Sequence, residues 1–128
     1  MAVITLTNAH KVKRAQASVD LADAGPNNSC IKLYTAQGGT LLGIRRLAKP
    51  CATISAAGVI TLLTSTDQDL VTTSGVSTYG TWVDGNDNAI ASGLVTDAAG
   101  AGPFKLGGTN GTQLYQGGIV QLATSTIG

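Results

Sequence analysis

Apolar residues recur at helical spacing only near the start of the chain. Four small ones follow one another at intervals of three and four residues: Val12, Ala15, Val19 and Ala22. This pattern predicts a helix over residues 8–24, capped by Thr7 or Asn8 and ended by Gly25 and Pro26. Because the apolar stripe is built from Val and Ala, the helix needs a close partner surface to be stable.

After residue 29 the pattern changes to short apolar runs separated by turn residues, which predicts strands. The predicted strands cover residues 30–35, 40–47, 51–55, 59–63, 76–83, 88–96 and 112–123, with 2–6 as a possible first strand. Glycine-containing turns are predicted at residues 37–39, 56–58 and 84–87. Pro50 has no N–H group and is predicted to mark a strand start or a sheet edge.

The remaining stretch, residues 98–111, has the weakest strand pattern. It is predicted to be a long loop, anchored by Phe104 and Leu106 pointing inward. The whole pattern indicates one domain of 128 residues in the mainly β class. We predict an antiparallel, jelly-roll-like β-sandwich over residues 30–123 with one N-terminal α-helix. The 17 Gly, the abundant Thr and Ala, and the absence of Glu agree with this class.

Charge is scarce in this sequence. Charged residues make up 12% of the chain and the net charge is +1. So small a net charge argues against a nucleic-acid partner. No apolar run is long enough for a membrane-spanning helix, so no membrane partner is expected. A surface rich in Thr, Ser, Asn, Ala and Gly has a smaller free-energy cost of desolvation than a charged surface, which favours permanent contacts with other proteins.

The few charges are unevenly distributed along the chain. Seven of the eight basic residues fall within the first 49 positions, whereas five of the seven aspartates follow position 66. One interpretation is chance clustering on solvated faces. The other is a basic protein-interface site that steers docking, formed by Lys11, Lys13, Arg14, Arg45, Arg46 and Lys49. In that case, reversing the charges of Arg45 and Arg46 is expected to leave the fold intact.

The sequence offers little material for catalysis. It contains one His and no Glu, so general acid–base catalysis is not expected and the chain is predicted not to be an enzyme. Cys30 and Cys51 are predicted to be buried thiols rather than a disulfide. With His10 they lack the close spacing of a zinc site, and no cofactor or metal is predicted.

Two further motifs have ordinary structural interpretations. Residues 84–88 resemble the start of a calcium loop, but Ala89 and Val95 occupy the positions of its glycine and glutamate, which favours a hairpin turn. Tyr79, Trp82 and Tyr115 suggest an aromatic platform for a carbohydrate. Trp82 lies three residues from Tyr79, however, so the two point to opposite faces of a regular strand, and Trp82 is better placed in the core.

Several segments resemble small proteins encoded near the capsid genes of tailed bacteriophages. They are LTNAHKVKRAQASVDLADAG with the following IKLYTAQGGTLLG, the hairpin SAAGVITL at residues 55–62, and STYGTWVDGNDNAIASGLV at residues 77–95. Together these segments account for 60 of the 128 residues and lie between positions 6 and 95. The long Gly-rich loop at residues 98–111 and the pair Arg45 and Arg46 have no counterpart in the family's pattern.

This group looks like head decoration, or cementing, proteins. The resemblance implies a structural virion protein that binds the outside of a capsid, contacts the major capsid protein and other copies of itself, and stabilises the joints between capsid subunits. It also implies assembly in the host cytoplasm and a final location on the capsid surface. The alternatives are a phage tail or fibre module and a carbohydrate-binding β-sandwich.

Overall fold

The computed structural model describes residues 4–66 and 68–127. Helix α1 (Asn8–Asp23) forms as predicted and ends one residue earlier than expected. Oγ1 of Thr7 accepts a hydrogen bond from the backbone N–H of His10 at 3.2 Å, so Thr7 is the N-cap. Three residues of the predicted stripe are buried: Ala15, Val19 and Ala22.

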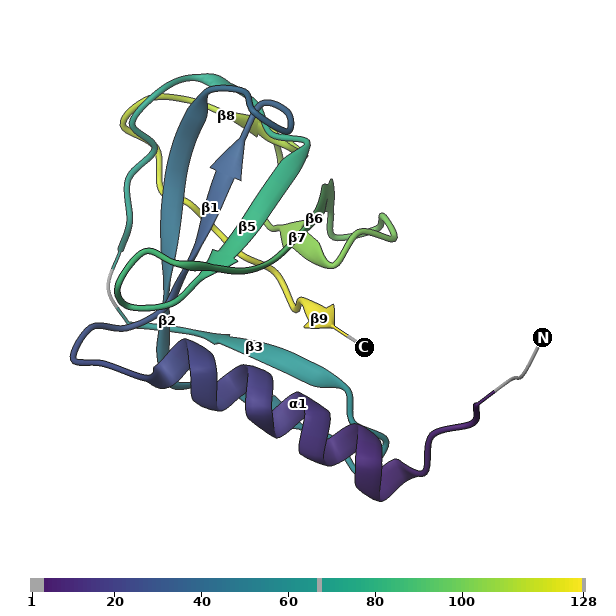
Figure 1. The fold of residues 1–128 in the computed structure, drawn as a ribbon. Helices are drawn as coiled ribbons and strands as arrows, with labels where there is room; N and C mark the ends of the chain where they lie inside the picture. Colours follow the sequence, from purple (N-terminus) through teal and green to yellow (C-terminus); the bar gives the residue numbers. More distant parts are fainter. Residues whose placement is uncertain (1–3, 67, 128) are drawn as a thin grey trace.

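Seven strands form one large sheet in the order β7-β6-β5-β1-β2-β3-β9, and α1 lies at one end of it (Figure 1). These strands are β1 (Cys30–Tyr34), β2 (Leu41–Ile54), β3 (Ile60–Thr64), β5 (Tyr79–Val83), β6 (Ala89–Asp97), β7 (Phe104–Leu106) and β9 (Thr126–Ile127). A separate two-stranded sheet pairs β4 (Gly75–Val76) with β8 (Gln113–Leu114). All named pairs are antiparallel except β6 with β7.

Strand β2 is longer than predicted and turns a corner of the fold. Its first half pairs with β1, up to Arg46 opposite Cys30, and its second half pairs with β3. The register is irregular between Leu47 and Ala52. Pro50, preceded by a cis peptide bond, therefore lies inside one strand rather than at a strand start, in the half of β2 that no longer pairs with β1. Its missing N–H group is tolerated there because the ladder is already interrupted.

The C-terminal segment closes the sheet. The backbone N–H of Ala123 donates to the carbonyl of Lys105 on β7 at 2.7 Å, and that of Leu62 on β3 donates to the carbonyl of Ser125 at 3.0 Å. Both edges of the sheet are thus covered by one short stretch, which ends as β9 beside β3 (Figure 1). The ordered β region extends beyond the predicted limit at residue 123.

Five strand predictions and one loop prediction need correction. Residues 40–47 and 51–55 are one strand, and 76–83 divides into β4 and β5 because the N–H groups of Ser77 and Thr78 donate to different segments, at Thr112 and Tyr34. Most of 112–123 is irregular, broken at Gly117, which has a φ of 84°. Within the predicted loop 98–111, β7 forms. Of the possible strand 2–6, residues 2 and 3 lie outside the described residues and 4–6 are not in a strand.

The predicted class is confirmed: 41% of the residues are in strands, 13% are helical, and the mostly antiparallel sheet is nearly closed, as in sandwich or barrel-like β folds. One hydrophobic core joins the helix to the sheet. Trp82 and Phe104 are its largest fully buried side chains, at 1% exposure each, and Leu106 is 2% exposed. Both the core position of Trp82 and the inward anchor formed by Phe104 and Leu106 are therefore confirmed.

Candidate protein-interaction site

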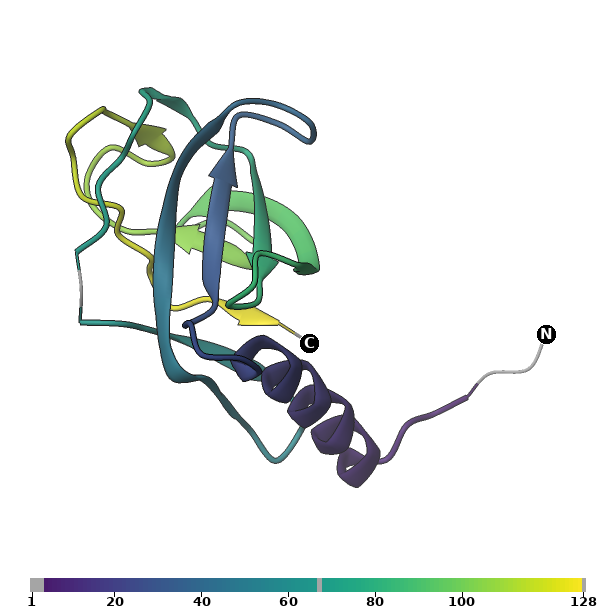
Figure 2. The same cartoon turned by 60° about the vertical axis from the view of Figure 1, so that its left-hand side comes forward.

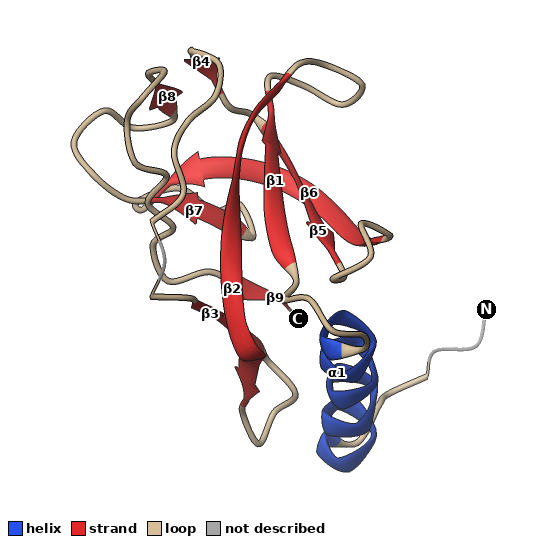
Figure 3. Cartoon of the chain, turned by 90° about the vertical axis from the view of Figure 1, so that its left-hand side faces the viewer, coloured by secondary structure: helices blue, strands red, loops and turns tan. Residues whose placement is uncertain are grey.

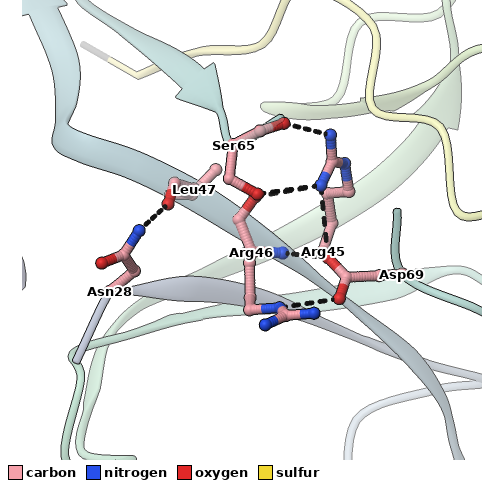
Figure 4. Close-up of polar contacts among 6 residues, drawn as sticks. All are labelled: Asn28, Arg45, Arg46, Leu47, Ser65 and Asp69. Carbon is pink, nitrogen blue, oxygen red and sulfur yellow. Dashed lines mark hydrogen bonds and ion pairs between the residues drawn. The ribbon is translucent and has the colours of Figure 1, made fainter. Parts of the chain in front are cut away.

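Arg45 and Arg46, two of the six predicted interface cations, are bound within the fold. The Asp69 carboxylate accepts hydrogen bonds from the backbone N–H of Arg46 at 2.7 Å, from its Nε at 2.9 Å, and from Nη1 of Arg45 at 3.2 Å (Figure 4). Nη2 of Arg45 also donates to the carbonyl of Ser65 at 2.8 Å. The side chains of Arg45 and Asp69 are only 12% and 6% exposed. This cluster ties β2 to the segment that follows β3.

The ionisation of Asp69 reflects this environment. Burial raises the pKa of its carboxyl group, but the hydrogen bonds from the Arg46 backbone, the Arg46 side chain and the Arg45 side chain outweigh burial and hold the pKa below its usual value. Asp69 is therefore a charged structural anchor. Reversing the charges of Arg45 and Arg46 would place carboxylates against Asp69, so this change is now expected to destabilise the fold, in contrast to the expectation from the sequence.

Other charges separated in the sequence also meet in the fold. Lys32 on β1 forms an ion pair with Asp87 in the β5–β6 hairpin. The hydrogen bond between the Lys32 and Asp87 side chains raises the pKa of Lys32. Nζ of Lys49 donates to the carbonyl of Gly25, just beyond α1. The sequence asymmetry thus produces contacts inside the molecule, and the six predicted cations do not all gather on one surface.

Lys11 and Arg14 remain as a pair beside a cleft. With Ala15 and Ser18 they occupy one face of α1, at i, i+3, i+4 and i+7, and this face borders a cleft of about 380 Å³ between the helix, the β2–β3 hairpin and β9. Further lining residues are Leu6, Ala57, Gly58, Ile60 and Ile127. The third helix cation, Lys13, is exposed but does not line the cleft. We call this feature the helix cleft.

Gly58 fixes one wall of the helix cleft. Its φ is +81°, and a Cβ placed there would lie 2.6 Å from the Cβ of Lys11. Only glycine allows both the turn and this close approach of the hairpin to the helix. The helix therefore lies directly against the β2–β3 hairpin, with β9 near it in the rotated view (Figure 2).

A second candidate surface lies at the opposite end of the molecule from α1. Residues 35–44, 70–78 and 107–121 contain no Asp, Glu, Lys, Arg or His. Backbone hydrogen bonds join them: Thr72 donates to Leu42, Val71 to Gly118, and Ser77 to Thr112. They include β4, β8 and the β1–β2 hairpin, which cluster away from the helix in Figure 3. We call this surface the uncharged end.

The uncharged end exposes several large apolar side chains: Leu41 (38%), Leu70 (57%), Val76 (49%), Tyr115 (56%) and Ile119 (45%). Leu70 and Ile119 are paired through an isolated β-bridge, so they are neighbours. Arg45 and Asp69, which flank two of the three segments, are largely buried and bound to each other. Low charge and exposed apolar side chains together are typical of a surface that packs against another protein.

The aromatic platform considered as an alternative for carbohydrate binding does not form. Trp82 is in the core, and the ring of Tyr79 lies 6.5 Å from that of Tyr34. Tyr115 lies on a different segment, beside a cleft of about 340 Å³ in the uncharged end that residues 107–111 also line. The three aromatics therefore do not share one surface.

The remaining chemical candidates have structural explanations. His10 is exposed in the first turn of α1. The Asp84 carboxylate accepts hydrogen bonds from the backbone N–H groups of Asn86 and Asn88, each at 2.9 Å, which confirms the hairpin turn. The Asn88 bond is the main cause of the lowered pKa of Asp84. Among residues 4–66 and 68–127, no three His, Cys, Asp or Glu side chains are grouped to hold a metal ion.

Both cysteines are free thiols. The prediction of burial is confirmed for Cys51, which is fully buried, whereas Cys30 is only half-buried. Burial raises the pKa of Cys51 to about 12, and the nearby Asp23 carboxylate adds to this shift. Burial also raises the pKa of Cys30 to about 11, against an opposing effect of Lys32. Neither thiol has the lowered pKa that marks a nucleophile.

We therefore predict that iodoacetamide will alkylate neither cysteine at an appreciable rate in the native protein near pH 7. The thiolate is the reactive form, and its fraction at this pH is very small for both residues. Mass spectrometry of tryptic peptides should show slow labelling of Cys30, slower labelling of Cys51, and full labelling of both in urea. Rapid native labelling of Cys51 would contradict its burial.

Comparisons with protein-family models, with curated proteins and with solved structures found no match to this chain. In the part of the chain that the structure describes, no helix combines the length and apolar character required to cross a membrane.

Proposed function

We propose that this chain is a structural virion protein that binds the outside of a phage capsid and stabilises contacts between major capsid protein subunits. The observation that carries the proposal is the uncharged end, where three segments without charged residues expose large apolar side chains. A permanent protein contact gains from apolar burial and loses little to desolvation on such a surface. The resemblance of several segments to decoration proteins supports the major capsid protein as the partner in this contact.

The proposed role is mechanical. A shell that holds packed DNA is under outward pressure, and it opens only when contacts between its subunits break. A protein that covers a joint adds buried area that must also be lost before the shell opens. The nearly closed sheet provides a rigid support for such a contact, because both of its edges are covered by the C-terminal segment.

The proposal is tested by adding the purified protein to undecorated heads of the phage that encodes it. Wild-type protein should sediment with heads in a fixed, high copy number. The double substitution Leu70→Glu and Ile119→Glu should reduce attachment about tenfold or more, because it places two carboxylates in a buried contact. Both residues are exposed, so the fold should be retained.

Leu21→Glu is the matched control. Leu21 is 54% exposed, similar to Leu70, but lies on α1 at the other end of the molecule. It should attach as wild type does. Sedimentation of wild-type protein with isolated tails instead of heads would favour the tail or fibre alternative. Equal attachment of the double variant and the Leu21 control would reject the uncharged end as the capsid contact.

A further inference from the structure

The helix cleft differs chemically from the uncharged end. Two cations, Lys11 and Arg14, border it, whereas aliphatic side chains such as Ile60 and Ile127 form part of its lining. Within the described part of the chain, none of the residues that line the cleft is acidic. A ligand that matches both features has carboxylates to meet the cations and an aliphatic group to cover the apolar lining.

We propose that the helix cleft binds an acidic protein segment that carries an aliphatic anchor residue. This inference rests on the proposed function, because a protein that joins neighbouring subunits needs a second contact surface besides the uncharged end. The volume of about 380 Å³ is at the small end of the range for ligand sites and suits an anchoring side chain rather than a long acyl chain.

The geometry keeps the two cations at the edge of the cleft. Lys11 and Arg14 are one helical turn apart on the same face as the lining residues Ala15 and Ser18. The close approach of Gly58 to the Cβ of Lys11 holds this part of the helix against the hairpin. The charged ends of both side chains are exposed to solvent, so attraction to the acidic segment will weaken as salt increases.

The test uses three short synthetic peptides: aspartates around a central leucine, the same peptide with each Asp replaced by Asn, and the aspartate peptide with a central serine. Two-dimensional NMR of the full chain should show shifts of the backbone amides of Lys11, Ser18, Ile60 and Ile127 with the first peptide. The Asn peptide and the serine peptide should each bind about tenfold more weakly, because one lacks the charge and the other lacks the anchor.

The double substitution Lys11→Glu and Arg14→Glu should abolish binding of the acidic peptide. Lys13→Glu is the matched control, since it reverses an exposed charge on the same helix outside the cleft. The double variant should still fold, because Lys11 and Arg14 are both exposed. Its thermal melting, followed by circular dichroism, should match that of wild type.

Equal binding of the Asn peptide, an equal loss in the Lys13 variant, or shifts outside the cleft would overturn the inference. Preferential binding of decanoate over the acidic peptide would also overturn it, in favour of a small amphiphile. These outcomes are independent of the attachment of wild-type protein to heads. Peptide binding without head attachment would reject only the capsid role, whereas head attachment without peptide binding would reject only the helix cleft.

Discussion

Asp69→Ala should lower the free energy of unfolding by about 3 kcal/mol, because it breaks a largely buried, charged hydrogen-bond cluster. The Asp69 carboxylate is the acceptor for three hydrogen bonds from Arg45 and Arg46, and the residue is 6% exposed. Asp69 also belongs to the segment that contacts the C-terminal region, where its carbonyl accepts from the N–H of Val120 at 2.8 Å. Urea unfolding followed by circular dichroism measures the loss.

Asp20→Ala is the control for this prediction. Asp20 is exposed on α1, where its carboxylate accepts from Nε2 of Gln16 at 2.7 Å. An exposed pair of this kind contributes little, so the change should stay within about 0.5 kcal/mol. Similar losses for the two variants would show that the Asp69 cluster is no stronger than an ordinary surface contact.

The same cluster should give the protein a characteristic dependence on pH. The pKa of Asp69 is lower in the folded protein than its ordinary value. The unfolded state therefore binds the proton more readily, and the stabilisation is complete above the unfolded pKa of about 4. It is lost as the pH falls through the folded value. Wild type should lose more stability than Asp69→Asn between about pH 7 and about pH 3, and parallel curves would contradict the charged state of Asp69.

Elements set by neighbouring residues were predictable from the sequence. Helix α1 was predicted to within one residue because its stripe, its cap at Thr7 and its end are all local signals. The three hairpin turns also form at the predicted places. In the third turn, at residues 84–87, the residue with a positive φ is Asp87 rather than Gly85. Gly85 is required for a different reason: a Cβ there would lie 2.2 Å from the carbonyl oxygen of Asn27.

Elements set by distant partners were not predictable. Strand β7 has only three residues and forms because β6 and the C-terminal segment lie on its two sides. The continuation of β2 through Pro50 depends on a change of partner from β1 to β3, which no local pattern records. Likewise, the interruption at Ser77 follows from a hydrogen bond to Thr112. Each of these three features depends on contacts with residues that are distant in the sequence.

The candidate site was predictable only in part. Arg45 and Arg46 stood out as a basic pair, but their partner Asp69 lies more than twenty residues later and gives no sequence signal. Lys11 and Arg14 were two of the six cations predicted for one interface. The cleft that they border depends on Ile60 and Ile127 from distant strands, which the sequence pattern did not indicate. For the uncharged end, the sequence indicated only that the overall charge is low. Strand pairing and backbone hydrogen bonds then bring its three segments together at one end of the molecule.

Ser125 is the residue on which closure of the sheet depends most directly. It is fully buried. Its Oγ accepts from the backbone N–H of Lys105 at 2.9 Å and donates to the carbonyl of Ala123 at 3.0 Å, and its own carbonyl accepts from Leu62. One residue thus joins β7 to β3. Ser125→Ala should cost about 1 to 3 kcal/mol, since it leaves the Lys105 N–H without this acceptor.

Truncation of the chain after Thr124 should have a larger effect. It removes the carbonyl that pairs with Leu62 and the pairing of β9 with β3, so about 3 kcal/mol or more of stability should be lost. It also uncovers the edge of β3, and an uncovered edge strand promotes association between molecules. Urea unfolding and light scattering would measure the two effects. Thr126→Ala, at an exposed position of β9, is the control and should remain stable and monodisperse. A truncated chain with wild-type stability would show that the sheet does not need this segment to hold its edges together.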